Sequence, residues 1–454
     1  MVASLIAIYW FQPSSSIRNL DFWFSTVAIW LTVLTWVITR STGTESKRAT
    51  LFTGLLLILI IMMIGLTRYI EPLCCITATH PPTFSIIASV LGAMTALVLL
   101  VNQIRGHQKT SSGIAILLIL AIFIIIKSPP LAHLASVGWR HATGQSTALA
   151  GSRDIIWLGF SYLAFRLLHV LRDFQNGKLP AFSLLNFLNY AVFFPAYQAG
   201  PIDRAQRFIA ESKENNLIMD SSGWRQKNLL NTMRGFERIL IGLFKKFVIA
   251  DTLAIIALNP TNAIQTVSTF WAWVLLVSFS LRLYFDFSGY TDIAIGLGQI
   301  MGWHLPENFA RPYLKQNLTL FWNGWHMTLA GWFRAYYFNP VTRWMRTRRF
   351  EIPAWIIILV GQFTTMVLIG LWHGITWNFF IWGAWHGIGL FIHNRWSEWT
   401  RPMWMGKSLK PVHQSLISVS GWLLTFGYVT LGWVWFALPT PELSLKVFKI
   451  LAGE

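Results

Sequence analysis

Long apolar stretches separated by short polar segments run along almost the whole chain. The stretches that approach the length of a membrane span cover residues 22–38, 51–66, 84–104, 114–126, 155–171, 247–258, 270–285, 318–338, 352–371, 376–392 and 416–438. A helix needs about 20 apolar residues to cross the ~30 Å hydrocarbon core of a bilayer. The pattern therefore predicts an all-α polytopic membrane protein with about eleven membrane-embedded segments, some spanning and some re-entrant.

Three segments depart from this pattern. Residues 129–152 contain Pro, Gly, Ser and Thr throughout, which predicts an external loop. Residues 184–197 are apolar but too short to span, and Pro195 interrupts them, so they predict a re-entrant or interfacial segment. In residues 204–246 basic residues outnumber acidic ones among scattered apolar positions, which predicts amphipathic helices on the inner leaflet. These helices can serve as a solvated basic face near anionic lipid, as a docking platform, or as both.

The basic residues also predict the orientation. Arg40 and Lys47 follow the first span, and Lys109 follows the third. The positive-inside rule then places these residues, together with Lys213 and Arg346, in the cytoplasm and the N-terminus outside. We expect a multi-pass protein of the plasma membrane.

Composition and charge narrow the class further. The chain has 454 residues, of which 54% are hydrophobic and 12% are charged, whereas soluble proteins average about 25% charged residues. Lys and Arg total 36 against 18 Asp and Glu, a formal net charge of +18. In a membrane protein this excess follows from the positive-inside rule, so nucleic acid is not expected as a partner. The excess also suits an acidic cytosolic partner or a phosphate-bearing donor.

Two pairs of charged residues lie in or beside apolar stretches. Arg166 and His169 are three residues apart and share a helical face, so the cation either faces the protein interior or snorkels to the interface. We favour snorkelling. Asp286 and Asp292 are six apart and do not share a face well, so we expect them to cap helices or to bind basic neighbours.

Two histidines in tryptophan-rich apolar surroundings are the main candidates for chemistry. His326 lies in Phe321-Trp322-Asn323-Gly324-Trp325-His326-Met327, and His373 lies in Gly370-Leu371-Trp372-His373-Gly374-Ile375-Thr376-Trp377. A titratable residue is costly in a membrane and is by default a functional hypothesis. The structural alternative is a hydrogen-bond partner between helices. The pattern leaves open whether His373 lies within a helix or at a break between two.

The motifs that are missing limit the chemistry. The sequence has no His-Glu-x-x-His, Gly-x-Ser-x-Gly or Gly-rich lysine loop, so zinc hydrolysis, α/β-hydrolase chemistry and P-loop chemistry have no support. His386 and His393 are seven apart but have no carboxylate or thiolate partner, so we predict no metal site. General-base catalysis by imidazole, with direct acyl transfer to a hydroxyl, is the remaining economical mechanism.

Several further motifs resemble the membrane-bound O-acyltransferase (MBOAT) family. In chain order they are Gly159-Phe160-Ser161-Tyr162-Leu163-Ala164-Phe165-Arg166, Phe194-Pro195, Gly200-Pro201-Ile202-Asp203-Arg204, Phe285-Asp286-Phe287-Ser288-Gly289-Tyr290, Asn308-Phe309-Ala310-Arg311-Pro312-Tyr313 and the two histidine motifs. The resemblance is to the bacterial branch that includes the teichoic acid D-alanyl transfer protein and the alginate O-acetylase. The Pro-Ile-Asp-Arg and His-Gly-Ile-Thr-Trp motifs favour the D-alanyl proteins.

The resemblance implies the fold and the site. It implies a ring of tilted helices around a central tunnel that joins a cytosolic donor to an extracytoplasmic acceptor. His373 would be the catalytic histidine and His326 the second active-site histidine. We expect N-terminal helices in residues 1–150, a catalytic core in 151–396 with the amphipathic segment at about 200–246, and a C-terminal helix and tail in 397–454.

The resemblance also implies the substrates and partners. The donor would be a cytosolic thioester, an acyl carrier protein phosphopantetheine or an acyl-CoA, used as a substrate without any bound cofactor. Candidate donor-docking residues are Arg204, Arg346 and Arg348. The acyl group would be acetyl or D-alanyl, and the acceptor a teichoic acid, an exopolysaccharide or a lipid-linked precursor. Other envelope-modification membrane proteins are expected partners.

Two positions depart from the family pattern. Relatives usually have Arg where Gly324 stands, and an Arg-Asp pair where Arg334 and Ala335 stand. The loss of one cation and one carboxylate is consistent with a compensated pair or with altered donor docking. An inactive scaffold of an envelope-synthesis complex is therefore one alternative. The other is a proton-coupled transporter or channel that uses the membrane histidines, although the sequence shows no inverted repeat.

Overall fold

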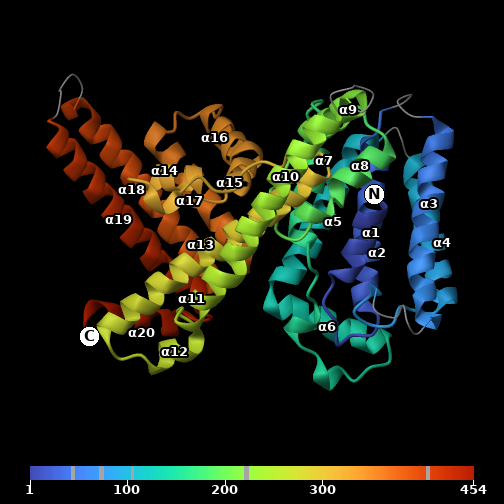
Figure 1. The fold of residues 1–454 in the computed structure, drawn as a ribbon, viewed down its shortest axis with the longest axis horizontal. Coiled ribbons are helices and arrows are strands. Elements are labelled where there is room, and N and C mark those ends of the chain that lie inside the picture. The colour runs from blue at the N-terminus through green and yellow to red at the C-terminus, as the bar shows by residue number, and fades with distance from the viewer. Residues whose placement is uncertain (42–45, 71–75, 104–106, 219–223, 405–409) are drawn as a thin grey trace. The chain divides into compact units, whose positions relative to one another are not determined.

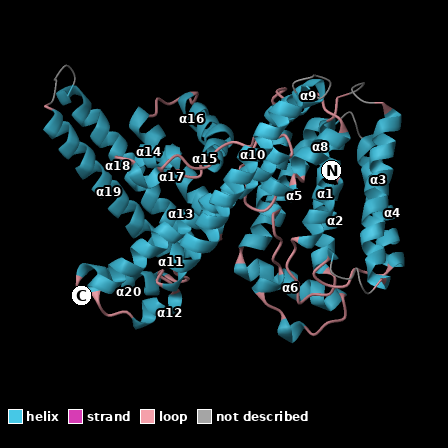
Figure 2. Ribbon diagram, in the orientation of Figure 1, coloured by secondary structure: helices cyan, strands magenta, loops and turns pink. Residues whose placement is uncertain are grey.

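A computed structural model describes residues 1–41, 46–70, 76–103, 107–218, 224–404 and 410–454, with the side chains of 213–228 and 404 left out. The described residues form helices and connecting loops without a strand (Figures 1 and 2). The prediction of an all-α chain is confirmed for this part of the protein.

The chain divides into two compact units. Unit 1 comprises residues 1–234 and 297–305, and unit 2 comprises 235–296 and 306–454. The division falls within two helices, α10 (Trp224–Leu243) and α13 (Thr269–Ile300). The predicted boundaries at 150 and 396 stay a prediction.

Unit 1 is built from nine further helices among its described residues. They are α1 (Val2–Trp10), α2 (Leu20–Thr39), α3 (Lys47–Leu66), α4 (Phe84–Gln103), α5 (Gln108–Lys127), α6 (Pro129–Ala142), α7 (Phe160–Gln175), α8 (Leu184–Ala191) and α9 (Ala205–Ile218). Its fully buried large side chains include Tyr9, Phe160 and Phe187, which place its core among α1, α7 and α8.

Unit 2 holds the remaining described helices and both candidate histidines. The helices are α11 (Asp251–Ile255), α12 (Pro260–Gln265), α14 (Leu318–Gly324), α15 (Met327–Phe333), α16 (Asn339–Arg346), α17 (Ala354–His373), α18 (Trp377–Trp404), α19 (Pro411–Ala437) and α20 (Pro441–Ala452). Trp382 and Trp433 are 1% exposed, so the core of this unit lies where α18 meets α19.

Seven helices of the described chain are long and apolar enough to cross a membrane. They are α2, α3 with the turn that follows it, α4, α5, α13, α17 and α19. The other predicted segments are shorter, broken or more polar. Helix α7 has 16 residues and α8 has eight, and the long helix α18 carries several Trp and His residues that lower its mean hydropathy. The multi-pass pattern is thus confirmed.

One prediction about local structure is wrong. Residues 129–152 are not a continuous loop, because Pro129–Ala142 forms helix α6 with proline at its first positions, where the missing N–H costs nothing. The apolar segment 318–338 is divided in the structure: the chain breaks between α14 and α15 and then enters a π-helical turn, Arg334–Phe338.

The favoured snorkelling of Arg166 is also wrong. Its side chain lies in the interior of unit 1 and is 2% exposed. The guanidinium donates to the carbonyl oxygens of Ala191 at 2.8 Å and Ala196 at 2.6 Å, at the end of α8 and in the short turn after it. A short segment leaves carbonyls that its own backbone cannot pair, and a five-donor guanidinium can satisfy several of them. Arg166 therefore holds the predicted re-entrant segment in place.

Asp286 and Asp292 lie inside α13, so the alternative in which they cap helices is wrong. Both bind basic neighbours as expected: Lys246 pairs with Asp286, and Asp292 pairs with Lys245 at 2.6 Å and Arg238 at 2.9 Å. The helices can approach this closely because Gly242 faces Gly289. A Cβ on Gly242 would lie 2.6 Å from the Gly289 carbonyl oxygen, closer than any real contact.

Candidate active site

His326 lies at the break between α14 and α15. Its φ of 43° is in the left-handed region, which is unusual for a residue other than Gly, Asn or Asp. The bend is fixed from Asn308: the Met327 amide donates to its carbonyl oxygen at 2.9 Å, and the Thr328 hydroxyl donates to its side-chain oxygen at 2.5 Å. Strained backbone of this kind persists where the surroundings over-determine it and is frequent at functional sites.

The His326 imidazole points into the interior of unit 2. The residue is 3% exposed, and its ring lies edge to face against Phe287 with the centroids 4.7 Å apart. Neither ring nitrogen has a hydrogen-bond partner among the described residues. Most buried polar groups are paired, so an imidazole in this state is available to a substrate group that reaches it.

His373 is the last residue of α17. The chain then turns through Gly374 to Thr376, and α18 begins at Trp377. The open question is resolved: His373 lies within a helix, immediately before a break. Gly370 allows the start of α18 to pack closely against the end of α17, because a Cβ on residue 370 would lie 2.1 Å from the Phe379 carbonyl oxygen.

Aromatic rings surround the half-buried His373 imidazole. Its centroid lies 4.8 Å from that of Phe436, 5.6 Å from Trp382 and 5.8 Å from Phe379. Aromatic walls limit the contact of an imidazole with water, which suits a group that exchanges a proton with a substrate hydroxyl.

One indole connects the two candidate histidines. Trp372 has its ring 4.6 Å from that of His373 and 6.1 Å from that of His326, and the Trp372 side chain is buried. The structure therefore brings together two residues that are 47 positions apart in sequence (373 − 326). The prediction that they share one region is consistent with this arrangement.

Sequence reasoning missed the role of His386 in this cluster. His386 on α18 is fully buried, with ring centroids 5.0 Å from Trp382 and 5.1 Å from Trp322. Trp382 also contacts His373, so a second indole joins His386 to the site. The sequence spacing pairs His386 with His393, but the Nδ1 of His393 instead lies 3.0 Å from the Thr319 hydroxyl. No local pattern reports the approach of α18 to α14, so no sequence signal marked His386.

A cavity opens beside Trp322. It has a volume of about 220 Å³ and is walled by α14, α15, α17 and α18. Its walls are mainly apolar, but the Trp322 indole nitrogen and the Gln362 side-chain oxygen are buried without a partner among the described residues. Arg334 lines it as well and donates to Asn323 at 2.8 Å. Apolar walls with a few convergent polar groups are typical of a small-molecule site.

The candidate donor-docking arginines all have exposed side chains. Arg346 ends α16, and Arg348 follows it with its guanidinium carbon 3.7 Å from the centre of the Trp344 ring. Arg204 belongs to unit 1, directly after Asp203. Their docking role stays a prediction. Among the described residues, no group of three or more His, Cys, Asp or Glu could hold a metal ion.

The departures at Gly324 and Ala335 lie next to the histidine break and the cavity. Gly324 packs on the loop before α14: its carbonyl oxygen accepts from the Ala310 amide at 3.0 Å, and a Cβ would lie 3.1 Å from the Ala310 carbonyl oxygen. A longer side chain does not fit without movement of this loop. Ala335 lies in the π-helical turn after α15, and π-helical turns are frequent at functional sites.

Comparison with known proteins decides the family. The MBOAT, membrane-bound O-acyltransferase, family profile matches residues 110–425. The chain belongs to the MBOAT family. It is a multi-pass membrane protein of that family, and the match includes His326, His373 and every wall of the cavity.

The similar MBOAT proteins carry names for three different polymers. The chain is 36% identical over 281 residues to the peptidoglycan O-acetyltransferase of Helicobacter pylori, covering 61% of this chain and 49% of that protein. It is 36% identical over 280 residues to the probable alginate O-acetylase of Pseudomonas syringae, covering 62% and 48%. It is 31% identical over 252 residues to the teichoic acid D-alanyltransferase of Bacillus subtilis, covering 54% and 61%.

These coverages limit what the names imply for this chain. The match spans about half the length of the peptidoglycan and alginate relatives. The identities do not single out one polymer, so the preference for the D-alanyl proteins stays a prediction.

Proposed function

We propose that this MBOAT protein transfers a short acyl group, acetyl or D-alanyl, from a cytosolic thioester to a hydroxyl of a cell-envelope polymer. The observation that carries the proposal is the placement of His373: half-buried at a helix break, walled by aromatic rings, and joined to His326 through one indole. The family and the names of the similar proteins support the same reaction class.

The proposed reaction is direct transfer with His373 as general base. Its imidazole accepts the proton of the acceptor hydroxyl, and the oxygen attacks the thioester carbonyl carbon. The tetrahedral intermediate collapses, the C–S bond breaks, and the proton passes from the imidazolium to the leaving thiolate. Water is excluded from the cluster, which disfavours hydrolysis of the thioester.

His326 acts as the second active-site histidine in this proposal. Its fixed, buried ring suits a group that orients the acceptor or donates a hydrogen bond to the oxyanion. The cavity beside Trp322 is the proposed place for the acyl end of the donor, since its apolar walls match a short acyl chain and its orphan polar groups match the amides of a pantetheine arm. No cofactor is needed, because the thioester is itself the activated substrate.

The wider arrangement belongs to the same proposal. A ring of tilted helices around a tunnel would let a cytosolic donor and an extracytoplasmic acceptor meet at the histidines. The exposed Arg204, Arg346 and Arg348 would meet an acidic carrier protein or a nucleotide-linked thioester. The N-terminus would lie outside the plasma membrane, and other envelope-modification membrane proteins would pass the acyl group on or present the polymer.

A transfer assay tests this function. Purified protein in lipid vesicles is supplied with acetyl and D-alanyl thioesters, as carrier-protein and coenzyme A forms, together with teichoic acid, alginate and peptidoglycan fragments. We expect alkali-labile ester on one acceptor with one donor. Thioesters left intact with every acceptor would contradict the proposal, and proton movement under the same conditions would favour a transporter.

A further inference from the structure

A second polar cavity lies in unit 1, away from the histidine site. It consists of two adjoining hollows of about 390 and 360 Å³, which share Arg18, Asn19 and Ile86. Each volume lies within the ~300–1,000 Å³ range of ligand sites. We call it the Arg18 groove. Its walls come from the start of α2, the residues after α3, the start of α4 and the end of α6, all within unit 1.

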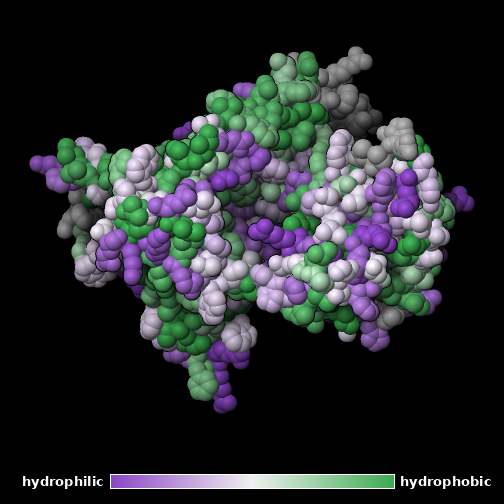
Figure 3. Space-filling view, turned by 90° about the horizontal axis from the view of Figure 1, so that it is seen from below, coloured by the Kyte–Doolittle hydropathy of each residue, from purple (hydrophilic) through white to green (hydrophobic). Residues whose placement is uncertain are grey.

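Cations and indoles gather in this groove. Arg18 and Arg68 line it, and neither pairs with a carboxylate among the described residues. Trp23 and Trp139 line the hollow beside them, and Trp139 is 41% exposed. The lower end of unit 1, in the right half of Figure 3, shows hydrophilic residues among apolar ones.

Two carboxylates near the groove are engaged elsewhere in the part of the chain that the structure describes. Asp21 is buried and accepts from the Thr79 amide at 2.8 Å and the Thr79 hydroxyl at 2.6 Å. Asp154 accepts from Arg140 at 2.9 Å and from Ser136 and Ser16 at 2.6 Å each. Neither of these two carboxylates neutralises Arg18 or Arg68, whose guanidinium groups line the groove.

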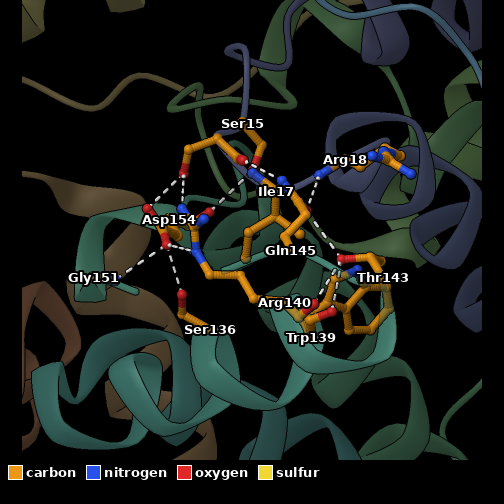
Figure 4. Close-up of polar contacts among 11 residues, drawn as sticks. Ser15, Ile17, Arg18, Ser136, Trp139, Arg140, Thr143, Gln145, Gly151 and Asp154 are labelled. Atoms are coloured by element: carbon orange, nitrogen blue, oxygen red, sulfur yellow. Dashed lines mark hydrogen bonds and ion pairs between the residues drawn. The ribbon is translucent and has the colours of Figure 1, made fainter. Parts of the chain in front are cut away.

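Neighbouring contacts fix the backbone at Arg18. In Figure 4 its side chain points away from the Asp154 network, while its amide donates to Gln145 Oε1 at 2.9 Å. Asn19 follows in the left-handed region with φ of 60°, and its side-chain amide donates to the His80 carbonyl oxygen at 2.6 Å. Arg68 is fixed in turn, because it donates to the Pro81 carbonyl oxygen at 2.6 Å. The backbone at Arg18 and the guanidinium of Arg68 are thus held beside the groove, which lowers the ordering cost of binding an anion there.

We propose that the Arg18 groove binds an anionic glycan segment. Arg18 and Arg68 pair with a phosphate or carboxylate of the polymer, and Trp23 and Trp139 lie against the apolar faces of neighbouring sugar rings. The interpretation of this groove as a subsite for the acceptor polymer rests on the proposed function. The binding of an anionic glycan to the groove does not. An arginine-tryptophan belt at the lipid interface is the simpler explanation of these residue types, but it does not require a groove or a fixed Arg18.

Binding to the full-length protein in neutral-lipid nanodiscs tests the proposal without any acyl donor. The probes are a fluorescent oligouronate, an oligomer of glycerol phosphate and a neutral oligosaccharide of equal length. We expect the anionic oligomers to bind, the neutral one to bind at least ~10-fold more weakly, and added salt to weaken the anionic complexes.

Variants separate the groove from general charge. Arg18→Gln and Trp139→Ala should each weaken oligomer binding, and Arg18→Gln with Arg68→Gln should weaken it by roughly tenfold or more, about 1.4 kcal/mol. Arg153→Gln is the matched control, since Arg153 is exposed and does not line the groove. Equal losses in the control and the groove variants would overturn the proposal.

Two further results distinguish other outcomes. One is that the protein binds anionic lipid in a way that depends on Arg18 and Arg68 and yet does not bind the oligomers. In that case the groove is a lipid-headgroup site and the proposal fails. Because no acyl transfer is measured, failure of oligomer binding leaves the proposed function of His373 standing. Oligomer binding without any acyl transfer would support the groove and count against that function.

Discussion

His326 and His373 contact the same indole ring, that of Trp372, from 6.1 and 4.6 Å between centroids. One histidine lies at a left-handed break before α15, and the other ends α17. The Trp372 indole thus packs against both histidine rings, so a change of its orientation would disturb both.

Trp372→Ala is therefore predicted to lower turnover even though the indole touches neither donor nor acceptor in the proposed mechanism. Displacement of a catalytic group by about 1 Å can cost ~10²-fold in rate. Trp372→Phe, which keeps an aromatic wall, should retain more activity. The measurement is kcat for both variants at equal amounts of folded protein. Equal loss in the two variants would show that an aromatic wall at this position is not sufficient and would contradict this prediction.

The partly buried Arg140–Asp154 pair predicts a pH dependence of stability in unit 1. Burial alone would raise the pKa of Asp154, but hydrogen bonds from Ser136, Ser16 and Arg140 lower it below its usual range. A carboxyl whose folded-state pKa is lowered stabilises the fold above its unfolded pKa of ~3.9 and loses this contribution as the pH falls through the folded-state pKa.

Asp154→Asn measures this contribution. A hydrogen bond to a charged group contributes about 1.5–3 kcal/mol, so the melting temperature in detergent should fall at pH 7. The gap between the variant and the unsubstituted protein should narrow as the pH drops below ~4. A constant gap from pH 7 to pH 3 would contradict the assignment of the shift to Asp154.

The basic end of α16 is predicted to act in donor association. Arg346→Glu with Arg348→Glu should raise KM for an acidic carrier donor and leave kcat near its original value, because both side chains are exposed at the surface. The effect should shrink as salt rises, since exposed charges are screened over about 8–10 Å. Arg401→Glu on α18 is the matched control. An unchanged KM at low salt would leave the two arginines only a role in membrane orientation.

The orientation is tested with single cysteines at two exposed serines. In a variant with Cys74 and Cys75 replaced by Ala, Ser146→Cys should react with an impermeant thiol reagent in intact cells, and Ser46→Cys should react only after permeabilisation. Equal labelling of both positions in intact cells would contradict an external N-terminus.

The sequence predicted the long apolar elements well and the local breaks poorly. Helices α13 and α17 follow from sustained apolar stretches that only a helix can satisfy in a membrane. Helix α6 is not evident from the sequence because proline, glycine and serine in 129–152 are typical of a loop. Proline is also favoured in the first turn of a helix, which is where Pro129 lies.

The candidate site was predictable only in part. His326 and His373 stood out because polar residues in apolar surroundings are rare. The break at His326 was not foreseen, because its left-handed backbone is imposed by Asn308 from a distant loop. The burial of Arg166 and the approach of His386 to Trp382 also depend on tertiary contacts that no local pattern encodes.

The most direct test of the account is acyl transfer per folded molecule for His373→Ala, with His326→Ala and His393→Ala beside it. Loss of a general base should lower the rate by about 10²–10⁴-fold while the amount of folded protein stays unchanged. His326→Ala should cost less or vary with the substrate. His393→Ala, which removes a contact to Thr319, should stay close to the original rate. A well-folded His373→Ala protein with near-normal turnover would contradict the catalytic assignment.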